Sequence, residues 1–433
     1  MRQMVFTVVG LVAVGCVLAD EKPTVAWSSS GGSSPRYSLW EGGLWSSAAL
    51  ASSVGAVPQW VVARECPTRS ELAVVTLDSQ KDVNVVRFDG ATWSAAEELC
   101  TDTDGNSTRC YDAAYEQASG RLLVAYWSKS HRKVAFRTSS GGAFSEEGTI
   151  AFPLSARVRT LKLVPKPSSD EIVMLVVGDD SRLCAAVWNG ASWNSPANLE
   201  SKVQTTECEC FSFCFESASG DGLIVYAEKN KNAPRYRTLV SGSWSEELSL
   251  PSVGGRPCWI RLAPEPGSDR VVFACLDRSS DVNTCIWNGS AWASAVEHEK
   301  SAESRDRRGL DVCFDSTGAV CLLAYTQKGK SSIRYRTLTG STWSSEGIGP
   351  TAGNRLGIVQ IVAEQGSNRL HVVCSDTSAR LHLMSWNGLT LTHHATPESA
   401  LGGGVKRESF MLAAPCDATT RKRVVRWRHV APE

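Results

Sequence analysis

The feature that most constrains this chain is a sequence unit that returns about every fifty residues. One version carries an aromatic residue, an Asn-Gly or Asp-Gly step and a second aromatic residue, as in "VWNGASW" at Val187–Trp193. A second version reads Tyr/Phe-Arg-Thr with an aromatic residue eight positions later, as in "RYRTLVSGSW" at Arg235–Trp244. The two versions alternate, and their closing positions, 48 to 51 residues apart, are Trp45, Trp93, Phe144, Trp193, Trp244, Trp292, Trp343 and Leu391. Eight equivalent positions at one period indicate eight copies of one structural unit.

Each unit resolves into four short strands, as residues 210–244 illustrate. The runs "CFSFCFE", "LIVYAE", "RYRTLV" and "SWSEEL" are rich in β-branched and aromatic residues, and polar or glycine-containing turns separate them. Asn-Gly and Asp-Gly suit a two-residue hairpin because both central positions adopt positive φ at low cost. Four-stranded units at this period are typical of a propeller. We therefore predict an all-β fold, an eight-bladed β-propeller of four-stranded antiparallel blades.

The two chain ends together supply the strands of one blade. The chain enters with "TVAW" and "RYSLW", which match later strands of the unit, and "SFMLAA" at Ser409–Ala414 matches an early strand. A composite blade from both termini would close the ring and cover its last sheet edges. "RVVRWRH" at Arg423–His429 also resembles an early strand. Because "TVAW" and "RVVRW" both resemble second strands, the sequence leaves open which of them takes that position.

The first nineteen residues resemble an export signal rather than a strand. Arg2 precedes the apolar run Met4–Ala19, which is too short for the roughly 20 apolar residues of a spanning helix. We expect residues 1–19 to be a signal peptide and 20–433 to form a single β-propeller domain, secreted or held in the periplasm or at the cell surface. Lipid attachment at Cys16 is a competing interpretation.

Charge and cysteine content narrow the classes further. The 45 basic and 45 acidic residues cancel, which gives no electrostatic signature for nucleic acid or an anionic membrane. Of 15 cysteines, 14 follow the leader, and no CxxC pair indicates a metal site. In an exported chain this usage favours disulfides. The candidate pairs, of which we expect at least one to form, are Cys100 with Cys110, Cys275 with Cys285, and Cys313 with Cys321.

The chain resembles exported bacterial repeat proteins with propeller folds, and loosely the sialidase-like and lectin propellers. Its Gly-x-x-Trp turns are similar to a reduced Asp-box, although the Ser and first Asp of that motif are missing from most copies. The resemblance implies architecture and carries no catalytic residue over.

Charged residues recur at two places that a propeller would bring to its axis or to one face. The positions predicted to line the central channel, on the first strands, are Asp112, Lys162, Arg261 and Asp311. The acidic loops between second and third strands carry Asp78, Asp82, Asp277 and Asp281, and alternate with lysine-rich loops. One interpretation is charge pairing between neighbouring blades. The other is a polar mouth that binds a ligand, with calcium in the Asp-x-x-x-Asp loops as a weaker variant and no other cofactor.

No catalytic constellation accompanies the repeats. The chain has no Gly-x-Ser-x-Gly elbow and no recurring histidine. The leading hypothesis is a non-catalytic binding module that recognises a carbohydrate or a protein, since Trp and Tyr suit sugar stacking and interface anchoring. The alternatives are an envelope or surface scaffold, and a glycan-acting hydrolase with an acidic pair at the channel mouth.

Overall fold

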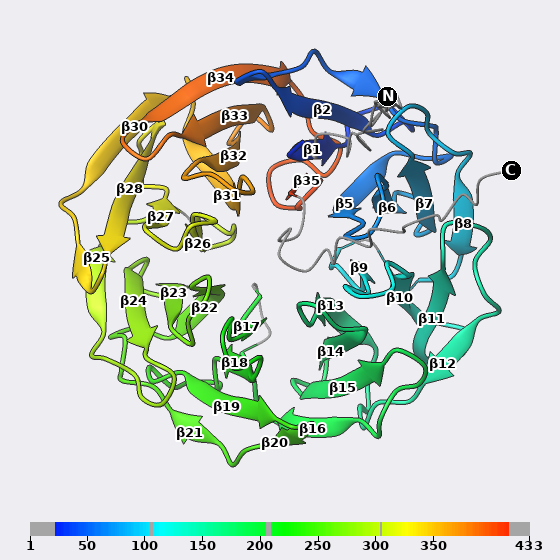
Figure 1. Cartoon of the computed structure of the whole chain (residues 1–433), viewed down its shortest axis with the longest axis horizontal. Coiled ribbons are helices and arrows are strands. Elements are labelled where there is room, and N and C mark those ends of the chain that lie inside the picture. Colours follow the sequence, from blue (N-terminus) through cyan, green and yellow to red (C-terminus); the bar gives the residue numbers. More distant parts are fainter. Residues whose placement is uncertain (1–21, 104, 106, 205–208, 304, 415–433) are drawn as a thin grey trace, which may run out of the picture.

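The structure is a computed structural model that describes residues 22–414 except 104, 106, 205–208 and 304. In this part of the chain, strands β1 to β35 form eight antiparallel sheets arranged as blades around a central axis (Figure 1). The predicted eight-bladed propeller is confirmed. No helix among these residues is long and apolar enough to cross a membrane.

The blades are numbered around the ring, and each is given from its innermost strand outward. Blade 1 consists of β35 (Phe410–Ala413), β1 (Thr24–Trp27), β2 (Arg36–Glu41), β3 (Leu44–Trp45) and β4 (Ala49–Leu50). Blade 2 consists of β5 (Pro58–Glu65), β6 (Leu72–Asp78), β7 (Val83–Phe88) and β8 (Glu97–Cys100), and blade 3 of β9 (Tyr111–Tyr115), β10 (Leu122–Ser128), β11 (Lys133–Ser139) and β12 (Gly148–Ile150). Blade 4 consists of β13 (Val158–Pro165), β14 (Glu171–Gly178), β15 (Leu183–Asn189) and β16 (Ala197–Glu200). Blade 5 consists of β17 (Phe211–Phe215), β18 (Gly222–Tyr226), β19 (Arg235–Val240), β20 (Ser243–Trp244) and β21 (Leu248–Ser249), and blade 6 of β22 (Pro257–Pro264), β23 (Val271–Asp277), β24 (Val282–Trp287) and β25 (Val296–Glu299). Blade 7 consists of β26 (Leu310–Phe314), β27 (Cys321–Tyr325), β28 (Ser332–Thr339), β29 (Thr342–Trp343) and β30 (Gly347–Thr351). Blade 8 consists of β31 (Leu356–Ala363), β32 (Leu370–Asp376), β33 (Leu381–Trp386) and β34 (Leu391–Glu398).

Blade 1 is the composite blade that closes the ring. The C-terminal strand β35 is its innermost strand and pairs with β1, so that Phe410 lies opposite Trp27 and Ala413 opposite Thr24. Strand β1 pairs on its other side with β2. "TVAW" is therefore the second strand of blade 1, and "RVVRW" lies outside the described residues.

The hairpins between third and fourth strands are of two kinds. In blade 5, Val240 pairs with Ser243, and the two-residue loop has positive φ at both Ser241 and Gly242, as predicted for such turns. The Asn-Gly hairpins differ from the prediction. Trp188 instead bridges to Trp193 across a four-residue loop, in which only Gly190 has positive φ. The side chain of Asn189 accepts hydrogen bonds from the backbone amides of Ala191 and Ser192, so it caps the turn rather than adopting the left-handed conformation.

Aromatic rings beside these hairpins pack neighbouring blades together. Phe136 of blade 3 lies 5.7 Å from Trp188 and 5.8 Å from Trp193 of blade 4, measured between ring centroids. Tyr236 of blade 5 makes the same contacts with blade 6. The recurring aromatic residues therefore form the seams between blades, which leaves the axis and the loop faces for a ligand.

Candidate functional site

Four charged side chains meet on the propeller axis, each two positions before the innermost strand of an alternate blade. They alternate in sign and are separated by 100, 99 and 100 residues: Arg109, Glu209, Arg308 and Glu408. All four are buried. We call them the axial ring.

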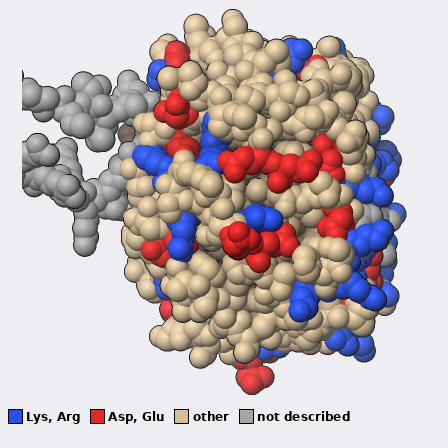
Figure 2. All heavy atoms as spheres, turned by 90° about the vertical axis from the view of Figure 1, so that its right-hand side faces the viewer, with Lys and Arg blue, Asp and Glu red and all other residues tan. Residues whose placement is uncertain are grey.

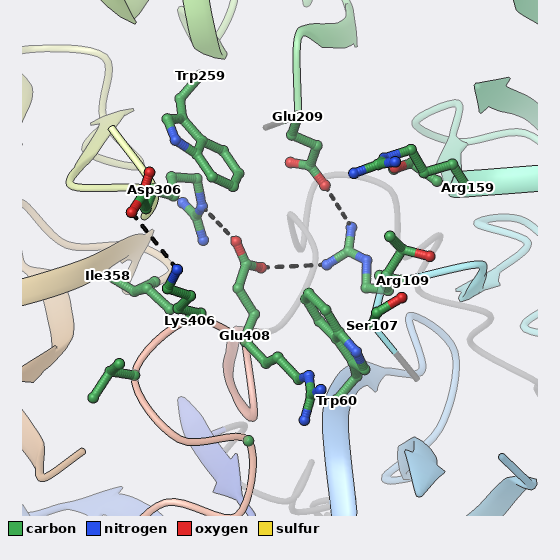
Figure 3. Close-up of a pocket in the computed structure, with 16 residues that line it drawn as sticks. Trp60, Ser107, Arg109, Arg159, Glu209, Trp259, Asp306, Ile358, Lys406 and Glu408 are labelled. Atoms are coloured by element: carbon green, nitrogen blue, oxygen red, sulfur yellow. Dashed lines mark hydrogen bonds and ion pairs between the residues drawn. The ribbon is translucent and has the colours of Figure 1, made fainter. Parts of the chain in front are cut away.

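Hydrogen bonds connect the axial ring across the channel (Figure 3). Arg109 donates from Nη2 to Glu209 Oε1 at 3.2 Å and from Nη1 to Glu408 Oε2 at 3.3 Å. Arg308 donates from Nε to Glu408 Oε1 at 2.7 Å. Glu408 thus accepts from two arginines of different blades immediately before the closing strand β35.

On one side of the axial ring lies a cavity of about 470 Å³, which we call the lower cavity. It is lined by all four residues that the sequence places in the channel: Asp112, Lys162, Arg261 and Asp311. Three of them contact the ring directly: Lys162 Nζ lies 2.5 Å and Arg261 Nη1 3.2 Å from Glu209 Oε2, and Asp311 Oδ2 lies 3.2 Å from Arg308 Nη1. The placement of all four at the axis agrees with the repeat alignment.

Arginines form ion pairs with both predicted channel aspartates. Asp112 Oδ1 accepts from Arg64 Nη2 at 3.0 Å. Asp311 Oδ2 lies 3.2 Å from Arg308 Nη1, and its other oxygen lies 3.4 Å from Arg261 Nε. Both aspartates of the lower cavity are therefore already ion-paired, and its lining contains more basic than acidic side chains.

Electrostatics keep the acidic residues of the ring ionised. Burial alone would raise the pKa of the Glu209 carboxyl, but Lys162, Arg109 and Arg261 hold it well below its usual range. Burial is likewise outweighed at Glu408, where Arg308 and Arg109 lower the pKa to about 2. Burial lowers the pKa of Lys162 to about 7, against the opposing effect of Glu209.

These pKa values bear on the hydrolase hypothesis. Glycoside hydrolysis requires one carboxyl group that holds a proton near neutral pH and donates it to the leaving group. Glu209 and Glu408 are the two acidic residues of the axial ring, and both are carboxylates that are ion-paired with basic side chains. The ring therefore lacks the general acid that such a mechanism requires.

On its other side, the axial ring forms the floor of an open pocket of about 520 Å³, the channel mouth. Trp60 on β5 and Trp259 on β22 occupy the same repeat position in blades 2 and 6, which face each other across the ring. Figure 3 shows the two indoles on opposite sides of Arg109 and Glu408. Trp259 Nε1 donates to the carbonyl of Arg305 at 2.8 Å, which fixes its ring.

Apart from Ile358, Gly403 and Val405, the remaining lining of the channel mouth is polar and mainly basic. Hydroxyl groups come from three lining residues: Ser107, Thr108 and Thr160. Outside the ring, the lining has three basic residues, Arg159, Lys406 and Arg407, and one acidic residue, Asp306. Asp306 lies 3.6 Å from Lys406, and Arg159 also pairs at 3.5 Å with Asp179, which does not line the mouth. The mouth therefore combines two apolar walls with hydrogen-bonding groups and an excess of positive charge.

The buried aspartates of the acidic loops accept hydrogen bonds from backbone amides of their own turns. Asp78 Oδ1 accepts from the backbone amides of Gln80 and Asp82 at 2.9 and 3.0 Å. Asp277 makes the same bonds to Ser279 and Asp281. Burial raises the pKa of Asp277 to about 6. In the described part of the chain, no three His, Cys, Asp or Glu side chains are grouped to hold a metal ion.

The lysine-rich loops on the same face are exposed, in contrast to the buried carboxylates of Asp78, Asp277 and Asp376. Their exposed basic residues are Lys129, Arg132, Lys133, Lys229, Lys231, Lys328 and Lys330. A side view of the disk shows Lys and Arg side chains gathered along its right-hand edge (Figure 2). Burial of these three carboxylates thus leaves the loops of this face with more exposed basic than exposed acidic side chains.

The predicted disulfides do not form in this structure. Cys275, Cys285, Cys313 and Cys321 are free thiols, and the Cys100 thiol donates to Asp102 at 3.1 Å. The pairing of β26 with β27 explains one case. Cys321 lies opposite Phe314, and therefore on the other face of the sheet from Cys313. That predicted pair is wrong.

Sequence reasoning missed the axial ring and the two mouth tryptophans. The signal was present as a strict Arg-Glu-Arg-Glu alternation one hundred residues apart. These positions precede the strands, where the repeat predicts loops, so the strand pattern alone does not single them out.

No known protein-family model matches the chain, and no curated protein matches its sequence. Among solved structures, the BP39L lectin from Burkholderia pseudomallei is similar with a TM-score of 0.56 and 13% identity, over 78% of this chain and 100% of that chain. AofleA from Arthrobotrys oligospora matches with a TM-score of 0.43 and 12% identity, over 69% and 88%. A mutant of the Aleuria aurantia lectin in complex with Fucα1-6GlcNAc matches with a TM-score of 0.41 and 16% identity, over 68% and 96%. The first of these supports the β-propeller fold, and the other two are too distant to add to it.

Proposed function

We propose that the protein is a non-catalytic carbohydrate-binding propeller that holds an acidic glycan at its channel mouth. The observation that carries the proposal is the pair of tryptophans, Trp60 and Trp259, that face each other above the buried axial ring. The structural likeness to the BP39L lectin is in keeping with it.

The chemistry of the mouth suits a sugar. Indole rings present flat apolar faces against which the C–H faces of a pyranose can stack. A pocket of about 520 Å³ lies within the usual range for small ligands. The hydroxyls of Ser107, Thr108 and Thr160 can exchange hydrogen bonds with sugar hydroxyls.

The charge of the mouth selects for acidic groups. Arg159, Lys406 and Arg407 outnumber Asp306, and the ring beneath them is neutral. The buried Nε of Arg109 has no hydrogen-bond acceptor, which leaves a donor for an oxygen of the ligand. Arginine and lysine bind carboxylate and sulfate through charge-assisted hydrogen bonds. We therefore expect uronic, sialic or sulfated sugars to bind better than neutral ones.

A glycan array tests this function with the wild type, Trp60→Ala and Trp259→Ala. Each truncation should weaken binding at least about tenfold, as expected for a buried aromatic anchor. Trp60→Phe and Trp259→Phe keep an aromatic face and are the matched controls, so they should retain most of the affinity. Binding should also weaken as NaCl rises from about 0.05 M to about 0.5 M, because salt screens the basic rim. A blank array, or unchanged binding by the alanine variants, would contradict the proposal.

We also propose that residues 1–19, which lie outside the described residues, direct export, so that the site meets glycans outside the cytoplasm. The basis is the charged start and apolar run of that segment. N-terminal sequencing of the protein purified from its own host should find the first nineteen residues removed. An unprocessed N-terminus would contradict this location.

A further inference from the structure

A second cavity, of about 390 Å³, lies between blades 1 and 2 and is separate from the channel mouth. It is lined by Glu65, the last residue of β5, whereas Trp60 lies near the start of the same strand. The two cavities therefore lie toward opposite ends of β5.

Glu65 departs from the repeat. It pairs with Leu72 on the second strand of its blade. The residues at the same register in the other even-numbered blades are uncharged: Pro165, Pro264 and Ala363. Among these blades, blade 2 alone introduces a carboxyl group here, so packing of the blade does not require one.

The carboxyl group of Glu65 lacks a charged partner. Its Oε1 atom is buried and makes no hydrogen bond. Burial raises the pKa of Glu65 to about 8, although a hydrogen bond from the side chain of Thr24 acts in the opposite direction. A buried polar atom without a partner is costly, and in a cavity it indicates a place for a ligand.

The other charged groups around the cavity are already paired. Lys22 Nζ lies 2.8 Å from Glu41, and Arg69 Nη2 lies 2.6 Å from Glu71. The remaining titratable group that lines the cavity is the Cys66 thiol, which donates to the Gly120 carbonyl at 3.5 Å. When Glu65 is ionised, the lining therefore carries one uncompensated negative charge.

We propose that this cavity binds a primary ammonium group on an aliphatic stem, with Glu65 as its counter-ion. Leu39, Leu72 and Phe88 supply the apolar wall for the stem, and the phenyl ring offers a face to the cation. A single ammonium ion neutralises the excess charge and gives Oε1 its missing donor.

Binding releases a proton. The free carboxyl is protonated at neutral pH, and the ammonium binds its ionised form. The affinity should therefore rise up to about tenfold per pH unit as pH approaches 8 and level off above it. At pH 7, about one proton should be released for each ammonium bound.

Calorimetric titration of the full chain with n-butylammonium chloride tests the proposal. The wild type should bind roughly tenfold more tightly at pH 8.5 than at pH 7. At pH 7, the binding enthalpies observed in phosphate and in Tris should differ by the difference between the ionisation enthalpies of the two buffers, because the buffer takes up about one proton for each ammonium bound. n-Butanol, which has the same stem without the charge, should not bind.

Glu65→Gln should abolish binding, while Glu98→Gln, which changes an exposed acid on β8 that does not line the cavity, should stay within about threefold of the wild type. Thermal unfolding shows that the variant is folded. Because burial raises the pKa of Glu65 from 4.5 to about 8, the wild type loses stability as pH rises between these two values. The melting temperature of Glu65→Gln should therefore exceed that of the wild type by a margin that grows from pH 5 to about pH 8 and stays constant above it. Absence of n-butylammonium binding to the wild type, or equal binding by Glu65→Gln, would overturn the proposal without affecting the channel-mouth site.

Discussion

Glu408→Gln should lower the free energy of unfolding by about 3–5 kcal/mol, the usual cost of breaking a buried ion pair by removing one partner. Glu408 is buried and accepts hydrogen bonds from Arg109 and Arg308. Gln keeps the shape but leaves two buried guanidinium groups without their shared counter-charge. The urea midpoint, measured by tryptophan fluorescence, reports the loss.

Glu98→Gln is the matched control, since Glu98 is an exposed acid on the outer strand of blade 2. Its free energy of unfolding should lie within about 0.5 kcal/mol of the wild-type value. Equal midpoints for Glu408→Gln and Glu98→Gln would show that the axial ring does not stabilise the fold.

Phe410→Ala should cost about 3–5 kcal/mol, as large-to-small changes of buried aromatic residues do. Phe410 is fully buried on β35 and packs in one cluster with Trp27 and Leu412. Because β35 joins the chain ends, we expect the loss to appear first as local opening of blade 1. Hydrogen exchange at the amides of Thr24–Trp27 should accelerate more than in blade 5.

The control is Leu389→Ala, since Leu389 is 81% exposed at a hairpin tip of blade 8. It should leave the free energy of unfolding within about 0.5 kcal/mol of the wild-type value and should not accelerate hydrogen exchange in β1. Equal exchange acceleration in blades 1 and 5 of Phe410→Ala would mean that the ring unfolds as a unit rather than from its closure.

Blade number and blade content could be predicted because local chemistry determines them. Turn residues and alternating apolar runs define each hairpin, and the period counts the copies. The ring closure followed from the same pattern, but the position of "TVAW" required the pairing of β1 with β35. Periodicity gives the kind of strand and not its partner.

The site was less accessible to sequence reasoning. Lys162 and Arg261 were placed at the axis because strand position alone brings them there. The Asp78 and Lys129 loops look equivalent in sequence, and only the fold distinguishes a carboxylate buried under its own turn from an exposed ammonium. The predicted Cys313–Cys321 pair failed for a similar reason, since neighbours across a hairpin can face opposite sides of a sheet.

The alternation of Arg109, Glu209, Arg308 and Glu408 also restricts how such a molecule can change size. Each hundred-residue pair of blades contributes one charge, and a closed circle of alternating signs requires an even number of contributions. Gain or loss of a single pair would bring two like charges together in the dry centre, at a cost of several kcal/mol. The parity of the circle therefore favours growth or shrinkage by four blades at a time, or replacement of the charges before a single pair is added.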